Sequence, residues 1–117
     1  MPIGAALSVI ARFGQRQDRD TGPWLGIGGM GASLDDAVVS EFRLARDKGV
    51  LLLEVVADSP AARAGLRLLD VIVAVDGRPV ASPEELQKAI AGVRPGQPLV
   101  VAFLRTSRLR RVTVLVE

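Results

Sequence analysis

The chain has 117 residues, a formal net charge of +2 and 49% hydrophobic residues, and it contains no cysteine and no histidine. This length suits one ordered domain with a short appendage, and the charge balance gives no push toward nucleic acid or anionic lipid. Without cysteine or histidine the chain cannot build a disulfide, a thiolate or imidazole metal site, or a Ser-His-Asp nucleophile system. We therefore expect no catalytic residue, no metal site and no cofactor.

The N-terminal stretch is predicted to be a short amphipathic helix. Apolar residues recur at three- and four-residue spacing at Ile3, Leu7, Ile10 and Phe13, and Gly14 is a natural stop. No basic residue precedes the apolar stretch, and no convincing cleavage site follows it, so we expect no targeting signal. The longest apolar runs are far shorter than the roughly 20 residues of a membrane helix, so no membrane insertion is expected.

A polar, charge-mixed linker covers residues 15–22 and marks a domain boundary. We therefore divide the chain into residues 1–21, a helix and linker, and residues 22–117, the folded domain.

Short strands and helices alternate through the rest of the chain. A serine is expected to cap the start of each helix. Ser33 and Ser82 are each followed three residues later by an acid, Asp36 and Glu85. Ser59 is followed directly by Pro60, and Gly65 ends this short helix. Asp76-Gly77 predicts a tight turn, and Arg94-Pro95-Gly96 ends the last helix. The strands are expected over 24–30, 50–56, 70–75, 99–105 and 110–116. The predicted fold class is α+β, a small, partly open β-barrel or sandwich of about five strands capped by two short helices.

The glycine-rich stretch from Pro23 to Gly29 is the strongest candidate for a binding site. A glycine within Trp24-Leu25-Gly26-Ile27 allows successive backbone N–H groups to turn toward one point. Converging amides form a small anion nest, and the anion that every peptide carries is its C-terminal carboxylate. The following residues have little side-chain bulk, so another backbone can lie close beside them.

These motifs occur in an order that resembles a PDZ domain of the HtrA (Deg) family of bacterial serine proteases, over about residues 22–117. The resemblance rests on Trp24-Leu25-Gly26-Ile27, on the block from Asp58-Ser59-Pro60-Ala61-Ala62-Arg63-Ala64-Gly65-Leu66 to Val75-Asp76-Gly77-Arg78-Pro79-Val80, and on the Ser82-capped helix. It implies that residues 1–21 correspond to the end of a preceding protease domain, and that the parent is an extracytoplasmic, periplasmic enzyme. Leu69 departs from the family, which usually has glycine before the Asp-Val-Ile strand, so that Leu69 either takes a strained dihedral or shifts the turn.

The resemblance implies a non-catalytic module that recognises C-terminal or extended segments of substrate proteins. The peptide adds as a strand antiparallel to Ile27–Met30, and amides around Leu25, Gly26 and Ile27 hold its carboxylate. On the helix from Ser82, Gln87 and Ala91 flank the core stripe and are expected to face the groove. The dissociation constant of a short peptide is expected to be micromolar, a binding free energy of about −8 kcal/mol. The expected peptide-binding residues are Trp24, Leu25, Gly26, Ile27, Gly28, Gly29, Met30, Gln87, Ile90 and Ala91.

Peptide binding is further expected to tighten the Ile27 strand against the Ser82 helix and to reposition the linker, Gln15 to Gly22. The expected partners are peptide C-termini or unfolded protein segments and the protease domain of the parent chain. Trp24 fits equally well a role in packing on the preceding helix.

Two other functions stay open from the sequence. The first is an assembly module, in which the apolar face of Ile3, Leu7 and Ile10 contacts another copy and forms a homo-oligomer without peptide binding. The second is an enzyme that uses carboxylates or a Ser-Lys pair, although only Lys48 and Lys88 are available. The acidic pairs at 35–36 and 84–85 are better explained as helix starts. The arginines at 105, 108, 110 and 111 are best explained as charges that guard a sheet edge.

Overall fold

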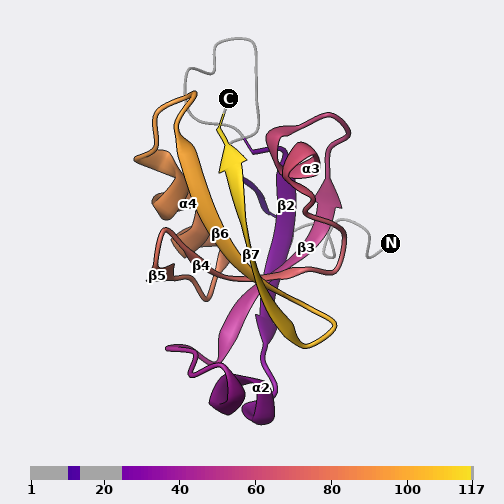
Figure 1. Cartoon of the computed structure of the whole chain (residues 1–117), viewed down its shortest axis with the longest axis vertical. Helices are drawn as coiled ribbons and strands as arrows, with labels where there is room; N and C mark the ends of the chain where they lie inside the picture. Colours follow the sequence, from indigo (N-terminus) through magenta and orange to yellow (C-terminus); the bar gives the residue numbers. More distant parts are fainter. Residues whose placement is uncertain (1–10, 14–24, 117) are drawn as a thin grey trace, which may run out of the picture.

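The computed structural model describes residues 25–116 and the backbone of residues 11–13. Over these residues the chain forms one antiparallel sheet in the order β1-β2-β3-β4-β6-β7, with the short β5 paired to β4 (Figure 1). The strands are β1 (Ala11–Phe13), β2 (Ile27–Ser33), β3 (Lys48–Val55), β4 (Val71–Val75), β5 (Arg78–Pro79), β6 (Pro98–Arg105) and β7 (Arg108–Leu115). The helices are α2 (Asp36–Glu41), α3 (Pro60–Ala64) and α4 (Pro83–Ala91).

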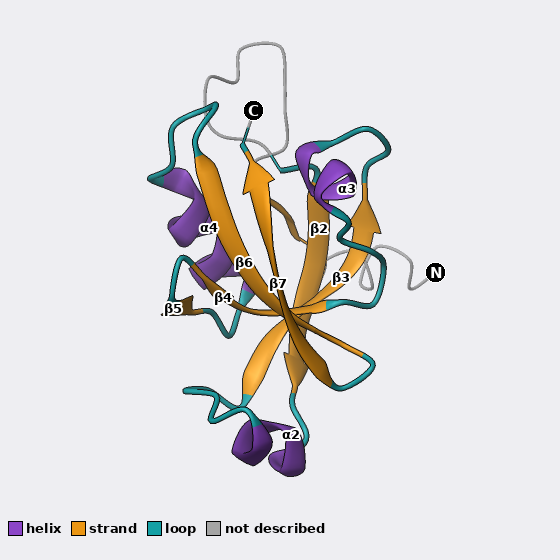
Figure 2. Ribbon diagram, in the orientation of Figure 1, coloured by secondary structure: helices purple, strands orange, loops and turns teal. Residues whose placement is uncertain are grey.

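The sheet is strongly twisted, and α3 and α4 lie at its two sides (Figure 2). Because α3 contacts β7 and α4 contacts β2 and β4, the twisted sheet is partly closed around a core. The main core is made of aliphatic side chains from every strand of the barrel wall together with one ring, Phe103. This arrangement confirms the predicted α+β, partly open barrel.

Local sequence signals account for most of the element boundaries. The Ser59 hydroxyl accepts a hydrogen bond from the Ala62 N–H at 3.2 Å, and Gly65 ends α3 in the left-handed region with a φ of 99°. The Asp76-Gly77 turn joins β4 to β5 with both residues at positive φ, as a two-residue hairpin requires.

The expected start of α2 is wrong by two residues. Ser33 does not cap the helix, because its backbone continues β2 and pairs with Lys48, and the next N–H, of Leu34, donates to the Asp47 carbonyl at 2.8 Å. The helix begins at Asp36 after Asp35, whose side chain makes no capping hydrogen bond. Sheet pairing therefore overrides the capping signature.

The expected helix does not extend to Phe13, because Ala11–Phe13 is a strand paired with β2. Residues 1–10, which carry the rest of that expected helix, lie outside the described residues. The described part of the chain thus has seven strands and three helices, where the sequence suggested about five and two. The additional strands are β1 and the two-residue β5, whereas each of the three helices follows one of the serines that were expected to begin a helix.

Candidate peptide-binding groove

The loop Leu25–Gly26 enters β2 through a left-handed glycine, since the φ of Gly26 is 81°. The Leu25 carbonyl accepts a hydrogen bond from the Ala61 N–H at 3.1 Å, and the Gly26 carbonyl accepts one from the Val56 N–H at 2.8 Å. In a trans peptide group the N–H points opposite to the preceding carbonyl. The N–H groups of Gly26 and Ile27 therefore point away from α3 and from the end of β3.

The edge of β2 that faces away from β3 begins at this loop. Within a strand the N–H and C=O of one residue share an edge, and successive residues alternate between the two edges. Since the Ile27 N–H points away from β3, Ile27 and Gly29 present their backbone groups to the opposite edge. The register shift between Gly28 and Gly29 places its extra residue, Leu53, in β3, so the alternation along β2 continues.

An extended segment already pairs with this edge. Ala11 lies opposite Gly29, Arg12 opposite Gly28, and Phe13 opposite Ile27, in antiparallel register. The strand β1 also contacts α4, so it lies in the space between β2 and that helix. The geometry of a strand added beside β2 is thus present within the chain itself.

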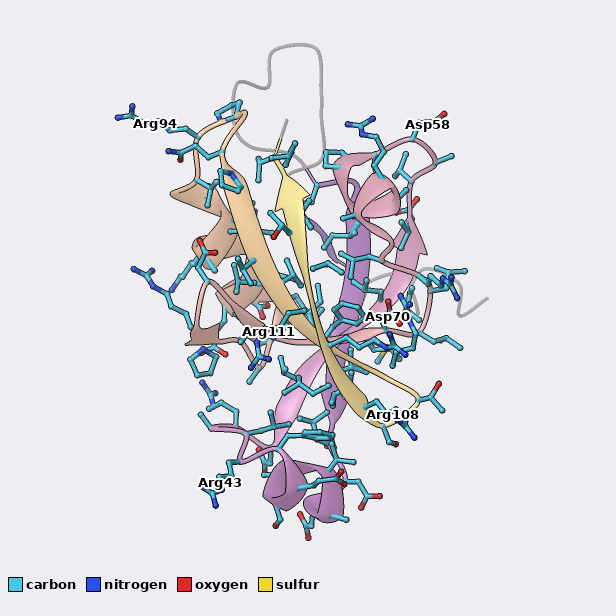
Figure 3. The ribbon with its side chains drawn as sticks, in the orientation of Figure 1. Arg43, Asp58, Asp70, Arg94, Arg108 and Arg111 are labelled. Carbon is cyan, nitrogen blue, oxygen red and sulfur yellow. The ribbon has the colours of Figure 1, made fainter. Side chains whose placement is uncertain are left out.

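We call the space between the edge of β2 and α4, which β1 occupies, the candidate groove. The helix α4 forms its second wall and runs opposite to β2. In Figure 1 β2 points down toward α2, whereas α4 leads upward to the loop of Arg94, labelled in Figure 3. A Cβ at Gly31 would lie 4.0 Å from Pro83 Cδ, so the first turn of α4 is beside the second half of β2. Gln87 is one turn further along on the same flank, toward the start of β2.

The apolar residues predicted for the site belong to the hydrophobic core. Leu25, Ile27 and Ile90 are at most 2% exposed and belong to the main core cluster with Leu86. Gln87 and Ala91 are exposed, which leaves their side chains available at the surface of α4. Core packing therefore fixes the position of the loop and of α4 before any ligand arrives.

The other predicted site residues have different places. Gly28 and Met30 present their backbone groups to β3, and they pair with Glu54 and Leu51. Gly29 is required by packing, because a Cβ there would lie 2.3 Å from the Leu51 carbonyl oxygen. Trp24 lies outside the described residues.

An ion pair that the sequence analysis missed supports the loop from behind. Asp70 is 2% exposed and accepts hydrogen bonds from Arg105 Nε at 2.9 Å and from Arg105 Nη2 at 2.7 Å. Arg105 Nη2 also donates to the Gly65 carbonyl at 2.7 Å, which ties β6 to the end of α3. Hydrogen bonding to Asp70 raises the pKa of Arg105 above its ordinary value. Since α3 holds the Leu25 carbonyl through Ala61, the pair stiffens the support of the loop.

The sequence predicts that Arg105 is a charge at the edge of the sheet, and this prediction is wrong. Arg105 is a partly buried structural residue. The other three arginines of that cluster, Arg108, Arg110 and Arg111, are exposed on β7, the last strand of the sheet. Arg108 and Arg111 are labelled in Figure 3. The sequence signal for the pair was Asp70 itself, a lone acid directly before an apolar strand, which needs a partner when buried.

The fold is that of a known class of module. The family model of the PDZ domain matches residues 25–116, and the chain belongs to this family. More particularly, it is a PDZ domain of the HtrA proteases, and it matches the non-catalytic PDZ part of those enzymes and not their protease domain.

Curated relatives align with most or nearly all of this chain but are much longer. A probable periplasmic DegP-like serine endoprotease of Halomonas elongata is 33% identical over 116 residues, which are 99% of this chain and 24% of the relative. The corresponding protein of Chlamydia muridarum is 36% identical over 83 residues, 71% of this chain and 17% of the relative. The chain thus spans at most about a quarter of these relatives.

Solved structures with the same fold include peptide complexes. The HtrA-type protease AlgW with a decapeptide has a TM-score of 0.63 and 28% identity, over 81% of this chain and 29% of that one. The HtrA3 PDZ domain bound to a phage-derived ligand, FGRWV, has a TM-score of 0.61 and 27% identity, over 81% of this chain and 85% of that one. Within the described residues, no helix is long and apolar enough to cross a membrane.

Proposed function

We propose that this PDZ domain binds extended segments of substrate proteins by strand addition to the edge of β2, beside α4. The observation that carries the proposal is the backbone of Ile27 and Gly29, which faces the groove and accepts an antiparallel strand in the structure. Backbone pairing supplies affinity for any extended segment, and the flank of α4 at Gln87 supplies selectivity. The peptide complexes of AlgW and the HtrA3 PDZ domain support this role.

A C-terminal carboxylate is one ligand group that suits the mouth of the groove. The amides of Gly26 and Ile27 point away from α3 and β3, and two adjacent amides of this kind attract an anion. We propose that the module recruits substrates to a periplasmic HtrA-like endopeptidase and relays binding to its protease domain.

The first test is a titration of the ¹⁵N-labelled chain with one pentapeptide in four forms. Two forms differ at the end, as free acid or amide. The other two carry one N-methyl group, on an amide that faces β2 or on its neighbour. Strand addition predicts that methylation of the amide facing β2 abolishes shifts at Ile27 and Gly29, and that methylation of the neighbour has little effect. Equal effects of the two N-methyl groups would contradict strand addition.

The free acid and the amide separate two recognition modes within the same groove. Shifts at Leu25–Gly29 that vanish on amidation mean carboxylate capture, and equal shifts mean recognition of internal segments.

A matched pair of variants tests the wall formed by α4. Gln87→Trp fills the flank beside β2 and is expected to weaken peptide binding at least about tenfold. Lys88→Trp places the same bulk on the exposed side of the helix, because adjacent helical residues lie about 100° apart, and should leave the affinity unchanged. Equal affinities for both variants would place the binding site elsewhere.

A further inference from the structure

The groove already has an occupant, and the occupant belongs to this chain. We propose that Ala11–Phe13 is an internal ligand of the groove, and that the groove takes internal extended segments of this kind without a free carboxylate. This inference rests on the proposed function of the groove and specifies its ligand class and its regulation.

The direction and register of β1 match those of an added peptide. β1 runs antiparallel to β2, so its C-terminal end approaches the loop Leu25–Gly26. Ala11 and Phe13 lie opposite Gly29 and Ile27, the two residues whose backbone faces the groove. β1 also contacts α4, the second wall. A peptide cannot pair with Ile27 and Gly29 while β1 does, because each backbone group serves one strand partner.

The segment reaches the loop as a continuous chain. Phe13 is followed by Gly14 in the sequence, so an amide group and not a carboxylate follows it. Backbone pairing with β2 and contact with α4 therefore suffice to place a strand here. An internal segment of a substrate protein presents the same groups.

Because β1 is covalently joined to the domain, it competes effectively with an external peptide for the edge of β2. Residues 14–26 join β1 to β2, and a linker of this length gives an effective concentration on the order of millimolar. An external peptide binds only the fraction of molecules in which β1 has left the edge, so its apparent dissociation constant rises by the inverse of that fraction.

Two proline variants of the full chain separate occupation from other effects. In the register of the structure the N–H of Ala11 faces β2, whereas the N–H of Arg12 faces away from it. Ala11→Pro removes a pairing donor, and Arg12→Pro removes a donor that does not pair with β2. Both positions precede residues 25–116, which the PDZ family model matches, so both variants are expected to fold.

The measurements are amide hydrogen exchange and peptide affinity. We expect Ala11→Pro to speed exchange at the Ile27 and Gly29 amides and to lower the dissociation constant of an external peptide by roughly fivefold or more. Arg12→Pro should change neither quantity by more than about twofold. A peptide of residues 9–15, acetylated and amidated, should bind the Ala11→Pro variant and shift the same two amides.

Each alternative outcome has a distinct meaning. Equal exchange and equal affinity for the natural chain and Ala11→Pro would overturn occupation of the groove. Protection that grows with protein concentration, with a doubled mass in the natural chain alone, would overturn the internal assignment, because a second copy would then supply β1. If Ala11→Pro exposes both amides but binds no peptide, occupation stands, and the proposed function fails together with the ligand class.

Discussion

Leu69 adopts a backbone conformation that an L-residue with a side chain rarely takes. Its φ is 71°, its side chain is 68% exposed, and its N–H donates to the Leu52 carbonyl at 2.8 Å. The left-handed conformation costs roughly 1–2 kcal/mol for a residue with a Cβ. The hydrogen bond to β3 holds the turn in place. Of the two alternatives that the sequence left open, Leu69 therefore adopts the strained dihedral, and the turn does not shift.

We expect Leu69→Gly to raise the free energy of unfolding by about 1 kcal/mol, because glycine removes the strain and loses part of that gain to backbone entropy. Urea unfolding measures the change. Leu68→Gly is the control, since Leu68 is also exposed but is not among the residues with positive φ, and it should give no stabilisation. Equal effects of the two substitutions would contradict this explanation.

The second residue-scale prediction concerns the pair between Asp70 and Arg105. Arg105→Leu would leave the Asp70 carboxylate buried with one remaining hydrogen bond, from the Arg67 N–H at 2.9 Å. The loss of the partner of a buried charge costs about 3 kcal/mol, which we expect as a lower free energy of unfolding. Arg108→Leu, at an exposed position of β7, should change stability by less than about 0.5 kcal/mol. A small effect of Arg105→Leu would show that water replaces the guanidinium.

At the scale of elements, two glycines of β2 have different roles. A Cβ at Gly29 would lie 2.3 Å from the Leu51 carbonyl oxygen, where the register of β2 and β3 shifts, whereas a Cβ at Gly31 has its nearest neighbour at 3.8 Å. We expect Gly29→Ala to destabilise the domain by about 1–3 kcal/mol, because β2 must move away from β3. Gly31→Ala should be neutral or slightly stabilising. Thermal unfolding of both variants tests the prediction, and equal destabilisation would refute it.

The N-terminus of α4 is held by a reciprocal cap. The Ser82 hydroxyl accepts a hydrogen bond from the Glu85 N–H at 3.2 Å, and Glu85 Oε1 accepts one from the Ala81 N–H at 2.8 Å. Arg46 Nη1 adds a hydrogen bond to Glu85 Oε2 at 3.0 Å. The Ala81 N–H first, and Arg46 second, lower the pKa of Glu85 below 4.5.

This lowered pKa predicts a pH dependence with a definite sign. The stabilisation is fully present above the unfolded pKa of 4.5 and is lost as the pH falls through the lower folded pKa. Glu85→Gln should therefore be less stable than the natural chain at neutral pH, and the difference should shrink in acid. Urea unfolding at several pH values measures it. Glu84→Gln, in the same turn, is the control, and an unchanged pH slope in Glu85→Gln would refute the prediction.

At the scale of the whole molecule, the sheet has a different apolar cluster on each face. Leu99 belongs to the main cluster with Ile27 and Ile90, which supports the groove. Leu104, on the same strand β6, belongs to the smaller cluster with Val38 of α2. Because successive residues of a strand point to opposite faces, the cluster behind the groove and the cluster beneath α2 lie on opposite faces of β6.

We expect Leu99→Ala to lower the free energy of unfolding by about 3 kcal/mol and to weaken peptide binding, because the cavity lies in the core behind the groove. Leu104→Ala should cost less, speed amide exchange in α2, and leave peptide affinity within about twofold. Calorimetry of unfolding and of peptide binding measures both variants. A similar loss of affinity in Leu104→Ala would show that the two faces are coupled.

Local signals allowed the turns, the caps of α3 and α4 and the succession of strands to be predicted. The start of α2 was not predicted correctly, because Ser33 has a capping side chain but lies within reach of Lys48 in a neighbouring strand. The left-handed turn at Gly26, which leads into β2, could also be predicted, since Gly26 has the positive φ that favours glycine. The pairing of Asp70 with Arg105 could not, because 35 residues separate the partners.

The sequence by itself therefore determined the order of the elements, the family and the glycine-dependent loop. The turns, the helix caps and the glycine-dependent loop depend on contacts between residues a few positions apart. The types of those residues restrict which backbone conformations are possible. Only the tertiary structure decided that Ala11–Phe13 is a strand and that it lies in the groove. Its apolar spacing suited a helix, but the edge of β2 offers unpaired backbone groups, and pairing with them satisfies both strands.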